Sequence, residues 1–258
     1  MRTVRTIPEV REAVRPERVG SRIGLVPTMG SFHQGHVSLF RAARSETDLV
    51  VVSLFVNAAQ FDDQADLDRY PRDEARDAAV AEEEGVDVLF APEASELYPD
   101  GFQTWVEVAE LGSILEGSFR PGHFRAVATV CCKLFNIVRP DAVYFGQKDA
   151  QQVEVIRRMI LDLDLELELR VLPTVREHDG LPLSSRNALL SPEERRRAAA
   201  LPRALATHDP VAARRLLDGL DVDYVEIAPF DPPVLAAAVR IGGTRLIDNA
   251  VLTKGDRP

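Results

Sequence analysis

Short apolar runs alternate with longer amphipathic segments over the first two-thirds of the chain. The apolar runs are rich in β-branched residues and have the length of buried strands, whereas the segments between them repeat apolar residues with a helical period. The predicted strands are 23–26, 49–56, 86–90, 142–145 and 167–172, and the clearest predicted helices are 72–84, 124–138 and 150–161. Such alternation is typical of an α/β fold in which crossover helices join parallel strands.

The pattern changes after about residue 174. Ser191, Pro192 and the two glutamates that follow form a strong helix start, because they supply a capping hydroxyl, a residue with preset φ and charges that suit the helix dipole. The later segments DYVEIAPF and TRLIDN predict two short strands. We therefore predict a Rossmann-like parallel-sheet domain over residues 1–174 and a smaller C-terminal α+β domain over residues 175–258.

Polar residues follow several of the predicted strands. Ligands of open parallel sheets bind beyond the carboxyl ends of the strands, so these positions are candidates for a site. They are Thr28 to Gly30 with the nearby histidines, then Asn57 and Gln60, then Gly146 to Asp149, and then Pro173 and Thr174 followed by the loop HDGLPLSSRN. We expect four strand ends to converge on one crevice.

Composition narrows the classes of function. The 258 residues are 45% hydrophobic, enough for a substantial core, and the net charge of −10 disfavours nucleic acid as a partner. The longest apolar run is far shorter than the roughly 20 residues that span a bilayer, so we expect no membrane contact and a cytoplasmic location. Cys131 and Cys132 are adjacent, which disfavours a disulfide between them, and no Cys/His cluster has zinc-site spacing.

Two of the five histidines lie three residues apart in the segment VPTMGSFHQGH. A strand, a Gly-containing turn and a helix beginning near Gly35 would present backbone N–H groups and the positive end of a helix dipole, which together favour an anion. His33 and His36 would point the same way on the first turn and donate hydrogen bonds to phosphate oxygens. The pair is also compatible with surface or capping histidines, and a zinc site is less favoured because no third ligand is evident.

The segment HQGH resembles the HXGH element of adenylate-forming nucleotidyltransferases. Taken with the other segments of the chain, it resembles the pantothenate synthetase family over nearly the whole length. The segments that carry this resemblance, in order, are PTMGSFHQGH, SLFVNAAQF, DLDRYPRD, RPGHF, KLFNIVRPDAVYFGQKDAQQ, DGLPLSSRN and TRLIDN.

The resemblance implies a two-step ligase reaction. ATP and pantoate would give pantoyl adenylate and pyrophosphate, and the amine of β-alanine would then displace AMP. It also implies Mg²⁺ with the ATP and a homodimer. Two alternatives remain: another small-molecule nucleotidyltransferase that transfers AMP to a phosphate, and a nucleotide-binding protein without turnover. Gln60 and Gln152 argue against the first, because a phosphate acceptor would favour Arg or Lys there.

The resemblance assigns residues to ATP and to catalysis. His36, His33, Lys148 and Arg186 would stabilise the charge that develops on the phosphates, with His36 at the position usually described as a proton donor. Asp149 would hold a ribose hydroxyl, orient Lys148 or assist the metal, and the residues alone do not choose among these roles. The full set implied for ATP is Met29, His33, His36, Gly146, Lys148, Asp149, Val175, Ser184, Ser185 and Arg186.

The resemblance also assigns residues to pantoate. Gln60 and Gln152 would bind its carboxylate and hydroxyls, since an amide both donates and accepts, with Met29 and Asn57 beside them. Gln151, one residue earlier, is expected to be an exposed helical amide. Arg120, His123 and Arg125 form a basic cluster that either lies near the adenylate or marks an ordinary turn into the next helix.

Two departures from the family pattern stand out. Ala58 replaces the proline of FVNPXQF, which should loosen the turn that presents Gln60. The stretch between SSRN and TRLIDN is shorter than the family usually has, which bears on closure of the C-terminal domain over ATP.

Overall fold

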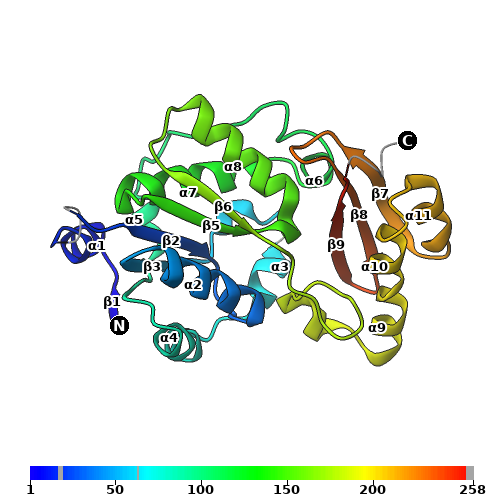
Figure 1. Cartoon of the computed structure of the whole chain (residues 1–258), viewed down its shortest axis with the longest axis horizontal. Helices are drawn as coiled ribbons and strands as arrows, with labels where there is room; N and C mark the ends of the chain where they lie inside the picture. Colours follow the sequence, from blue (N-terminus) through cyan, green and yellow to red (C-terminus); the bar gives the residue numbers. More distant parts are fainter. Residues whose placement is uncertain (17–19, 63, 254–258) are drawn as a thin grey trace. The chain divides into compact units, whose positions relative to one another are not determined.

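The computed structural model describes residues 1–16, 20–62 and 64–253, and the chain forms two compact units (Figure 1). Unit 1 comprises Met1–Phe145 and Val155–Leu172, and unit 2 comprises Gly146–Glu154 and the chain from Pro173 onward. Unit 2 thus includes a short piece that follows the fifth strand of unit 1. The functional boundary near residue 174 stays a prediction.

Unit 1 is built on a six-stranded parallel sheet with the order β1-β4-β3-β2-β5-β6. The expected α/β fold is therefore confirmed. Every residue of the central β3 but the last is buried, as is typical of a strand covered on both faces. The strands are β1 (Arg2–Val4), β2 (Ile23–Thr28), β3 (Leu49–Leu54), β4 (Val88–Phe90), β5 (Ala142–Gly146) and β6 (Glu168–Leu172).

Helices connect these strands and cover the sheet (Figure 1). Phe40 and Ala43 of α2 pack with Val26, Val50 and Val52 in one apolar cluster, which fixes α2 and the turn before it against the sheet. The helices are α1 (Ile7–Val14), α2 (Gln34–Glu46), α3 (Gln64–Arg69), α4 (Glu74–Glu83), α5 (Ala94–Leu97), α6 (Glu116–Phe119), α7 (His123–Val138) and α8 (Ala150–Asp162).

Unit 2 carries an antiparallel sheet with the order β7-β8-β9, backed by three helices. Leu201, Leu205 and Leu217 pack with Leu235 and Val239 in its core. Ser191 caps the first helix, as predicted, and the structure adds that it does so in a capping box with Glu194. The elements are α9 (Pro192–Ala198), α10 (Ala200–Leu205), α11 (Pro210–Leu216), β7 (Asp221–Ala228), β8 (Val234–Ile241) and β9 (Thr244–Val251).

Two strands were not predicted. β8 has the sequence VLAAAVRI, in which every residue except Arg240 is buried, so it lacks the alternation of a half-exposed strand. β1 has only three residues, too few for a periodic pattern. The predicted strand 86–90 begins two residues later in the structure, at Val88, and the predicted helix 72–84 spans only Glu74–Glu83.

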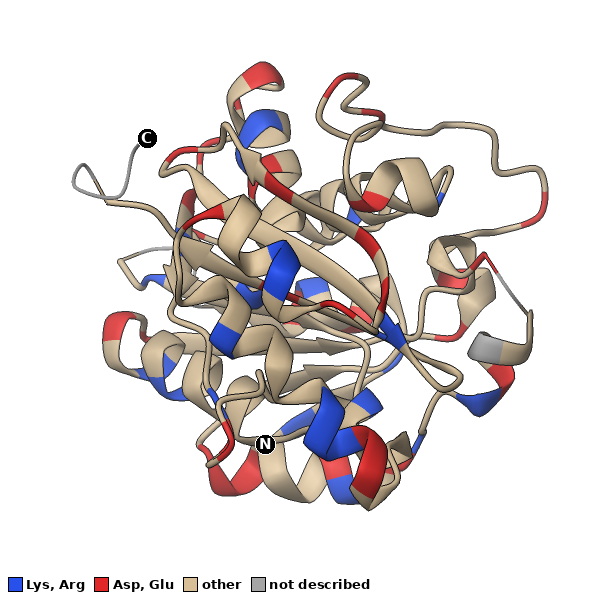
Figure 2. Cartoon of the chain, turned by 90° about the vertical axis from the view of Figure 1, so that its right-hand side faces the viewer, with Lys and Arg blue, Asp and Glu red and all other residues tan. Residues whose placement is uncertain are grey.

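Charged residues lie mostly on helices and loops, with both signs interspersed (Figure 2). Within the described part of the chain, no helix combines the length and the apolar character that crossing a membrane requires. Cys131 and Cys132 are both free thiols, which confirms that they do not form a disulfide.

Candidate active site

The two histidines of HQGH are joined by a capping box at the start of α2. His33 is the N-cap residue, and its Nδ1 accepts a hydrogen bond from the Gly35 backbone N–H at 3.1 Å. His36, three residues later, accepts from the His33 backbone N–H through Nδ1 at 3.3 Å. The ring centroids are 4.2 Å apart, so the sequence prediction that both side chains gather at a helix N-terminus is met by the geometry.

These contacts fix the tautomer of each ring. A backbone N–H can only donate, so Nδ1 must act as the acceptor in both neutral imidazoles, and the proton of each is on Nε2. Both rings are half-buried. The arrangement therefore places two imidazole N–H donors at the positive end of the α2 dipole, which is suited to an anion.

A buried carboxylate holds the turn that leads into this helix. Asp77 of α4 is 1% exposed, and its two oxygens accept from the backbone N–H groups of Ser31 at 2.7 Å and Phe32 at 2.8 Å. Gly30 and Ser31 have φ of 86° and 55°, so the turn uses the left-handed region at two consecutive residues. Sequence analysis missed Asp77, because an acidic residue on an amphipathic helix carries no signal that it is buried.

Gln60 lies beyond the end of β3 and is 8% exposed. Its Nε2 is 2.9 Å from Sδ of Met29, beyond the end of β2, and its Oε1 accepts from Nδ2 of Asn57 at 3.2 Å. Asn57 is itself buried and also donates to the carbonyl of Ala126 at 3.3 Å. The structure thus brings together three of the predicted pantoate residues, with Asn57 orienting the amide of Gln60.

Part of the basic cluster 120–125 holds the backbone of Gln60. The Gln60 carbonyl accepts from Arg120 at 3.0 Å and lies 2.9 Å from Nδ1 of the buried His123. Since a carbonyl cannot donate, Nδ1 of His123 carries the proton, and Nε2 faces the Arg120 guanidinium at 3.3 Å. Arg125 is oriented differently, with its guanidinium carbon 5.1 Å from the centroid of the Trp105 ring.

The segment that follows β5 carries a first group of the candidate residues in unit 2. After Gly146, the short 3₁₀ helix Gln147–Asp149 leads into α8, and Nζ of Lys148 lies 3.4 Å from Oδ1 of Asp149. Both side chains are partly exposed, and the Lys148 ammonium is therefore accessible to a phosphate. Gln152 is half-buried. Gln151 is 5% exposed, so the prediction of an exposed helical amide is wrong: the first turn of α8 buries it.

Ser184, Ser185 and Arg186, predicted to bind the phosphates, lie at the start of another 3₁₀ helix of unit 2, Ser185–Leu189. The hydroxyl of Ser184 caps it by accepting from the Arg186 backbone N–H at 3.3 Å. The Val175 carbonyl accepts from the Leu183 N–H at 2.9 Å, which closes the intervening loop. Val175, Ser184, Ser185 and Arg186 are all half-buried.

No group of three or more His, Cys, Asp or Glu side chains suited to holding a metal ion occurs among the described residues.

The candidate residues fall in both units. They are His33, His36, Met29, Asn57 and Gln60 in unit 1, and Gly146, Lys148, Asp149, Gln152, Val175, Ser184, Ser185 and Arg186 in unit 2.

Similarity to known proteins covers almost the whole chain. The chain is 50% identical to the pantothenate synthetase of Roseiflexus castenholzii and 48% identical to pantothenate synthetase 1 of Bradyrhizobium diazoefficiens, with 98% of this chain and 99% of the relative covered in each case. These alignments extend over 278 and 279 positions, so the relatives contain residues that this 258-residue chain lacks. Where the missing residues lie stays a prediction.

Solved structures show the same similarity in the fold. Pantothenate synthetase from Thermus thermophilus superposes with a TM-score of 0.92 at 44% identity, covering 97% of this chain and 99% of the other. A pantoate-beta-alanine ligase from Francisella tularensis, complexed with beta-gamma ATP and beta-alanine, gives 0.87 at 35% identity with 97% of both chains covered. The family model described as pantoate-beta-alanine ligase matches residues 2–251, and the chain belongs to that family.

Proposed function

We propose that this chain condenses pantoate with β-alanine at the expense of ATP, forming pantothenate, AMP and pyrophosphate through a pantoyl adenylate. The observation that carries the proposal is the paired histidine cap of α2 in a chain whose family match extends over residues 2–251. A carboxylate is a poor electrophile at neutral pH, so adenylation is needed to supply a leaving group before an amine can attack.

In the first step a pantoate carboxylate oxygen would form a bond to the α-phosphorus, and the bond from that phosphorus to the bridging oxygen of pyrophosphate would break. Negative charge shifts onto the pyrophosphate as it leaves. The Nε2–H groups of His33 and His36 would donate to these oxygens, and electrostatic stabilisation of this kind needs no proton transfer. Lys148 would add a positive charge, and Ser184, Ser185 and Arg186 would bind phosphate oxygens. Gly146 and Val175 would provide backbone at the nucleotide.

Mg²⁺ would enter with ATP, since it takes most of its ligands from phosphates and water. The residues present fit a Mg²⁺ ion bound in this way, because the Asp149 side chain is 44% exposed and offers its carboxylate as a ligand. The ion would neutralise charge on the phosphates during the transfer. A role for Asp149 in holding a ribose hydroxyl or in orienting Lys148 remains compatible with its position 3.4 Å from Nζ.

Pantoate would be bound by amides rather than by guanidinium groups. Gln60 is presented on a fixed backbone and can exchange its contact with Met29 for a pantoate oxygen, while Gln152 would supply a second amide. An arginine bound tightly to the attacking carboxylate would lower its nucleophilicity and stabilise the ground state. In the second step the β-alanine amine would attack the acyl carbon, the bond from that carbon to the AMP oxygen would break, and the amine would release a proton to solvent.

The test is release of pyrophosphate and AMP by the purified protein with ATP and Mg²⁺, with each acid substrate present or omitted. Pyrophosphate release that requires pantoate, with AMP and pantothenate appearing once β-alanine is added, is the expected result. His36→Ala should reduce pantoate-dependent pyrophosphate release by about 10² or more, on the scale of a lost electrostatic transition-state contact.

His208→Ala is the matched control, because this histidine lies between α10 and α11, outside every segment selected for the site. It should retain wild-type turnover. Pyrophosphate release that ignores pantoate but responds to a phosphorylated acceptor would instead indicate a different nucleotidyltransferase, and wild-type turnover of His36→Ala would remove the proposed role of that residue. Light scattering of the same sample would test the proposed homodimer, and fractionation of cells the cytoplasmic location.

A further inference from the structure

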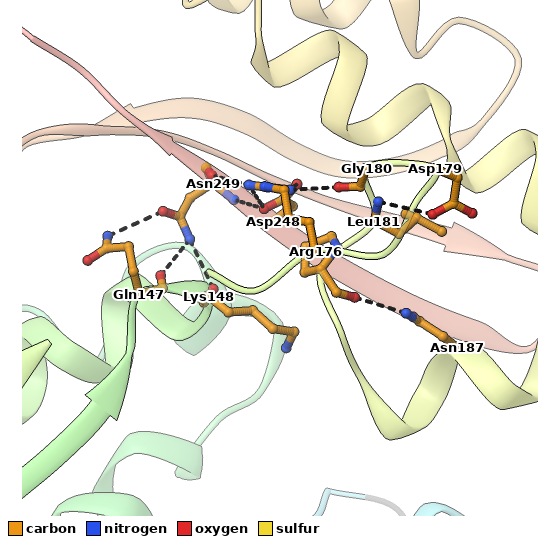
Figure 3. Close-up of polar contacts among 10 residues, drawn as sticks. Gln147, Lys148, Arg176, Asp179, Gly180, Leu181, Asn187, Asp248 and Asn249 are labelled. Carbon is orange, nitrogen blue, oxygen red and sulfur yellow. Dashed lines mark hydrogen bonds and ion pairs between the residues drawn. The ribbon is translucent and has the colours of Figure 1, made fainter. Parts of the chain in front are cut away.

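Asn249, near the end of β9, is in direct contact with the backbone that carries Lys148 (Figure 3). Its side-chain Nδ2 donates to the carbonyls of Gln147 and Lys148, both at 2.9 Å. Its Oδ1 accepts from Nε2 of Gln147 at 3.3 Å. Asn249 is 5% exposed, so these three hydrogen bonds are made away from water, where they are strongest.

The chemistry of these contacts requires an amide at this position. A carbonyl can only accept, so Nδ2 must face the two backbone oxygens, and both of its N–H donors are used. An aspartate of the same shape would keep the bond from Gln147 Nε2, but it would place a carboxylate oxygen against the two carbonyl oxygens and leave both carbonyls without a donor. Of the side chains of this size, only asparagine satisfies both carbonyls and Gln147 together.

β9 is itself fixed at this point by its neighbour. Asp248 is 2% exposed and receives two hydrogen bonds from the Arg176 guanidinium, at 2.7 and 3.0 Å. Arg176 also donates to the Asn249 carbonyl at 3.3 Å, and the Asn249 N–H donates to Oδ1 of Asp248 at 2.8 Å. The backbone of Asn249 is thus held by side chains on the outer edge of the sheet, where no further strand is paired with β9 among the described residues.

We propose that Asn249 is a positioning residue that fixes the 3₁₀ turn Gln147–Asp149 and so sets where the Lys148 ammonium can reach. This inference rests on the proposed role of Lys148 in binding the ATP phosphates. A lysine reaches its ligand through a flexible stem, so the direction of approach is set by the backbone from which the stem leaves. A displacement of about 1 Å at a reacting centre lowers rates by as much as 10²-fold, which makes such fixation consequential.

The experiment compares Asn249→Ala, Asn249→Asp and Lys148→Ala, with the double variant Asn249→Ala/Lys148→Ala completing a cycle. Asn249→Ala should lower kcat/KM for ATP by about 10-fold or more, as expected for three lost hydrogen bonds, and Asn249→Asp by more. KM for pantoate should change less than about 2-fold. In the Lys148→Ala background, Asn249→Ala should have little further effect, because the group it positions is gone.

The matched control is Asn136→Ala, which removes an exposed amide that donates to the carbonyl of Cys132 at 2.8 Å on α7. It should leave all kinetic constants unchanged. Hydrogen exchange measured by mass spectrometry gives a second readout that needs no turnover: in Asn249→Ala, amides of the peptide 146–152 should exchange faster than in the wild type, and those of α2 should not.

Two failures are distinguishable. If the wild type releases no pantoate-dependent pyrophosphate, or Lys148→Ala retains full activity, the proposed function of Lys148 fails. If both behave as proposed but the effects of Asn249→Ala and Lys148→Ala multiply, or peptide 146–152 keeps its protection, Asn249 serves only general stability and the positioning role is wrong. A variant too unstable to assay would be recognised by faster exchange throughout unit 2, which also contradicts a local role.

Discussion

Removal of the Asp77 carboxylate should destabilise unit 1 and disrupt the histidine cap of α2. Asp77 of α4 is only 1% exposed. Its carboxylate oxygens accept hydrogen bonds from the Ser31 and Phe32 backbone N–H groups at 2.7 and 2.8 Å. Each hydrogen bond to a charged group contributes about 1.5–3 kcal/mol, so Asp77→Ala should cost about 3–6 kcal/mol. Unfolding of a domain typically requires only about 5–15 kcal/mol, so this is a large fraction of the total.

The assay is urea unfolding followed by fluorescence of Trp105, the single tryptophan, which lies in unit 1 with Asp77. Asp77→Asn should lose about 2–4 kcal/mol, because its amide can accept from one backbone N–H but presents its own N–H groups to the other. Turnover should fall with both variants even where the protein is folded, since the turn they loosen ends at His33. The matched control is Asp73→Ala on the same helix, whose exposed carboxylate only caps α4 by accepting from Arg76 N–H at 3.0 Å and should cost about 1 kcal/mol. Equal destabilisation by Asp73→Ala and Asp77→Ala would refute the reasoning.

Two further predictions concern single residues of unit 1. Gly30→Ala should destabilise the folded protein by at least about 1 kcal/mol and lower turnover. The reason is that φ is 86° and that an added Cβ would lie 2.7 Å from Leu54 Cδ1 and 2.8 Å from Asp77 Oδ2. Unchanged unfolding of this variant in urea would contradict this account of the turn. Burial raises the pKa of the Cys131 thiol to about 12, above the ordinary 9.0, so its contribution to stability is present below pH 9 and is lost as pH rises toward 12. At pH 8 iodoacetamide should therefore spare Cys131 in the folded protein, and mass spectrometry that finds it alkylated before unfolding would disprove its burial.

The sequence predicts the sheet of unit 1 better than that of unit 2, for a physical reason. Parallel strands buried on both faces appear as continuous apolar runs, and five of the six were located to within two residues. β8 is as apolar as those strands, but it is rich in alanine, which is poor in strand propensity, and it follows two prolines. Its identity as a strand comes from pairing with β7 and β9, and pairing is a property of the fold rather than of the segment.

The same distinction holds for the candidate site. The residues proposed for the chemistry could be selected from the sequence because they follow strands and match family segments: His33, His36, Gln60 and Lys148 all lie at such positions. Residues that hold them were not predictable. Gln151 was expected on the surface because it sits beside Gln152 in a polar pair, yet α8 turns it inward. Only the packing of α8 determines which of two adjacent amides is buried.

Four residues that hold the backbone beyond the strand ends perform one common task, which sequence analysis did not predict for any of them. A turn after a parallel strand leaves backbone N–H and C=O groups without partners in the sheet, and buried groups of this kind must be satisfied. Asp77 accepts from two N–H groups after β2, Arg120 donates to the Gln60 carbonyl after β3 while His123 contacts the same oxygen, and Asn249 donates to two carbonyls after β5. In each case the acceptor or donor comes from a segment distant in sequence and matches the polarity that the turn presents: a carboxylate for N–H groups, and N–H donors for carbonyls. Substitution of these supporting residues should therefore impair turnover as strongly as substitution of some groups that would contact the substrates, because a displaced turn moves every side chain it carries.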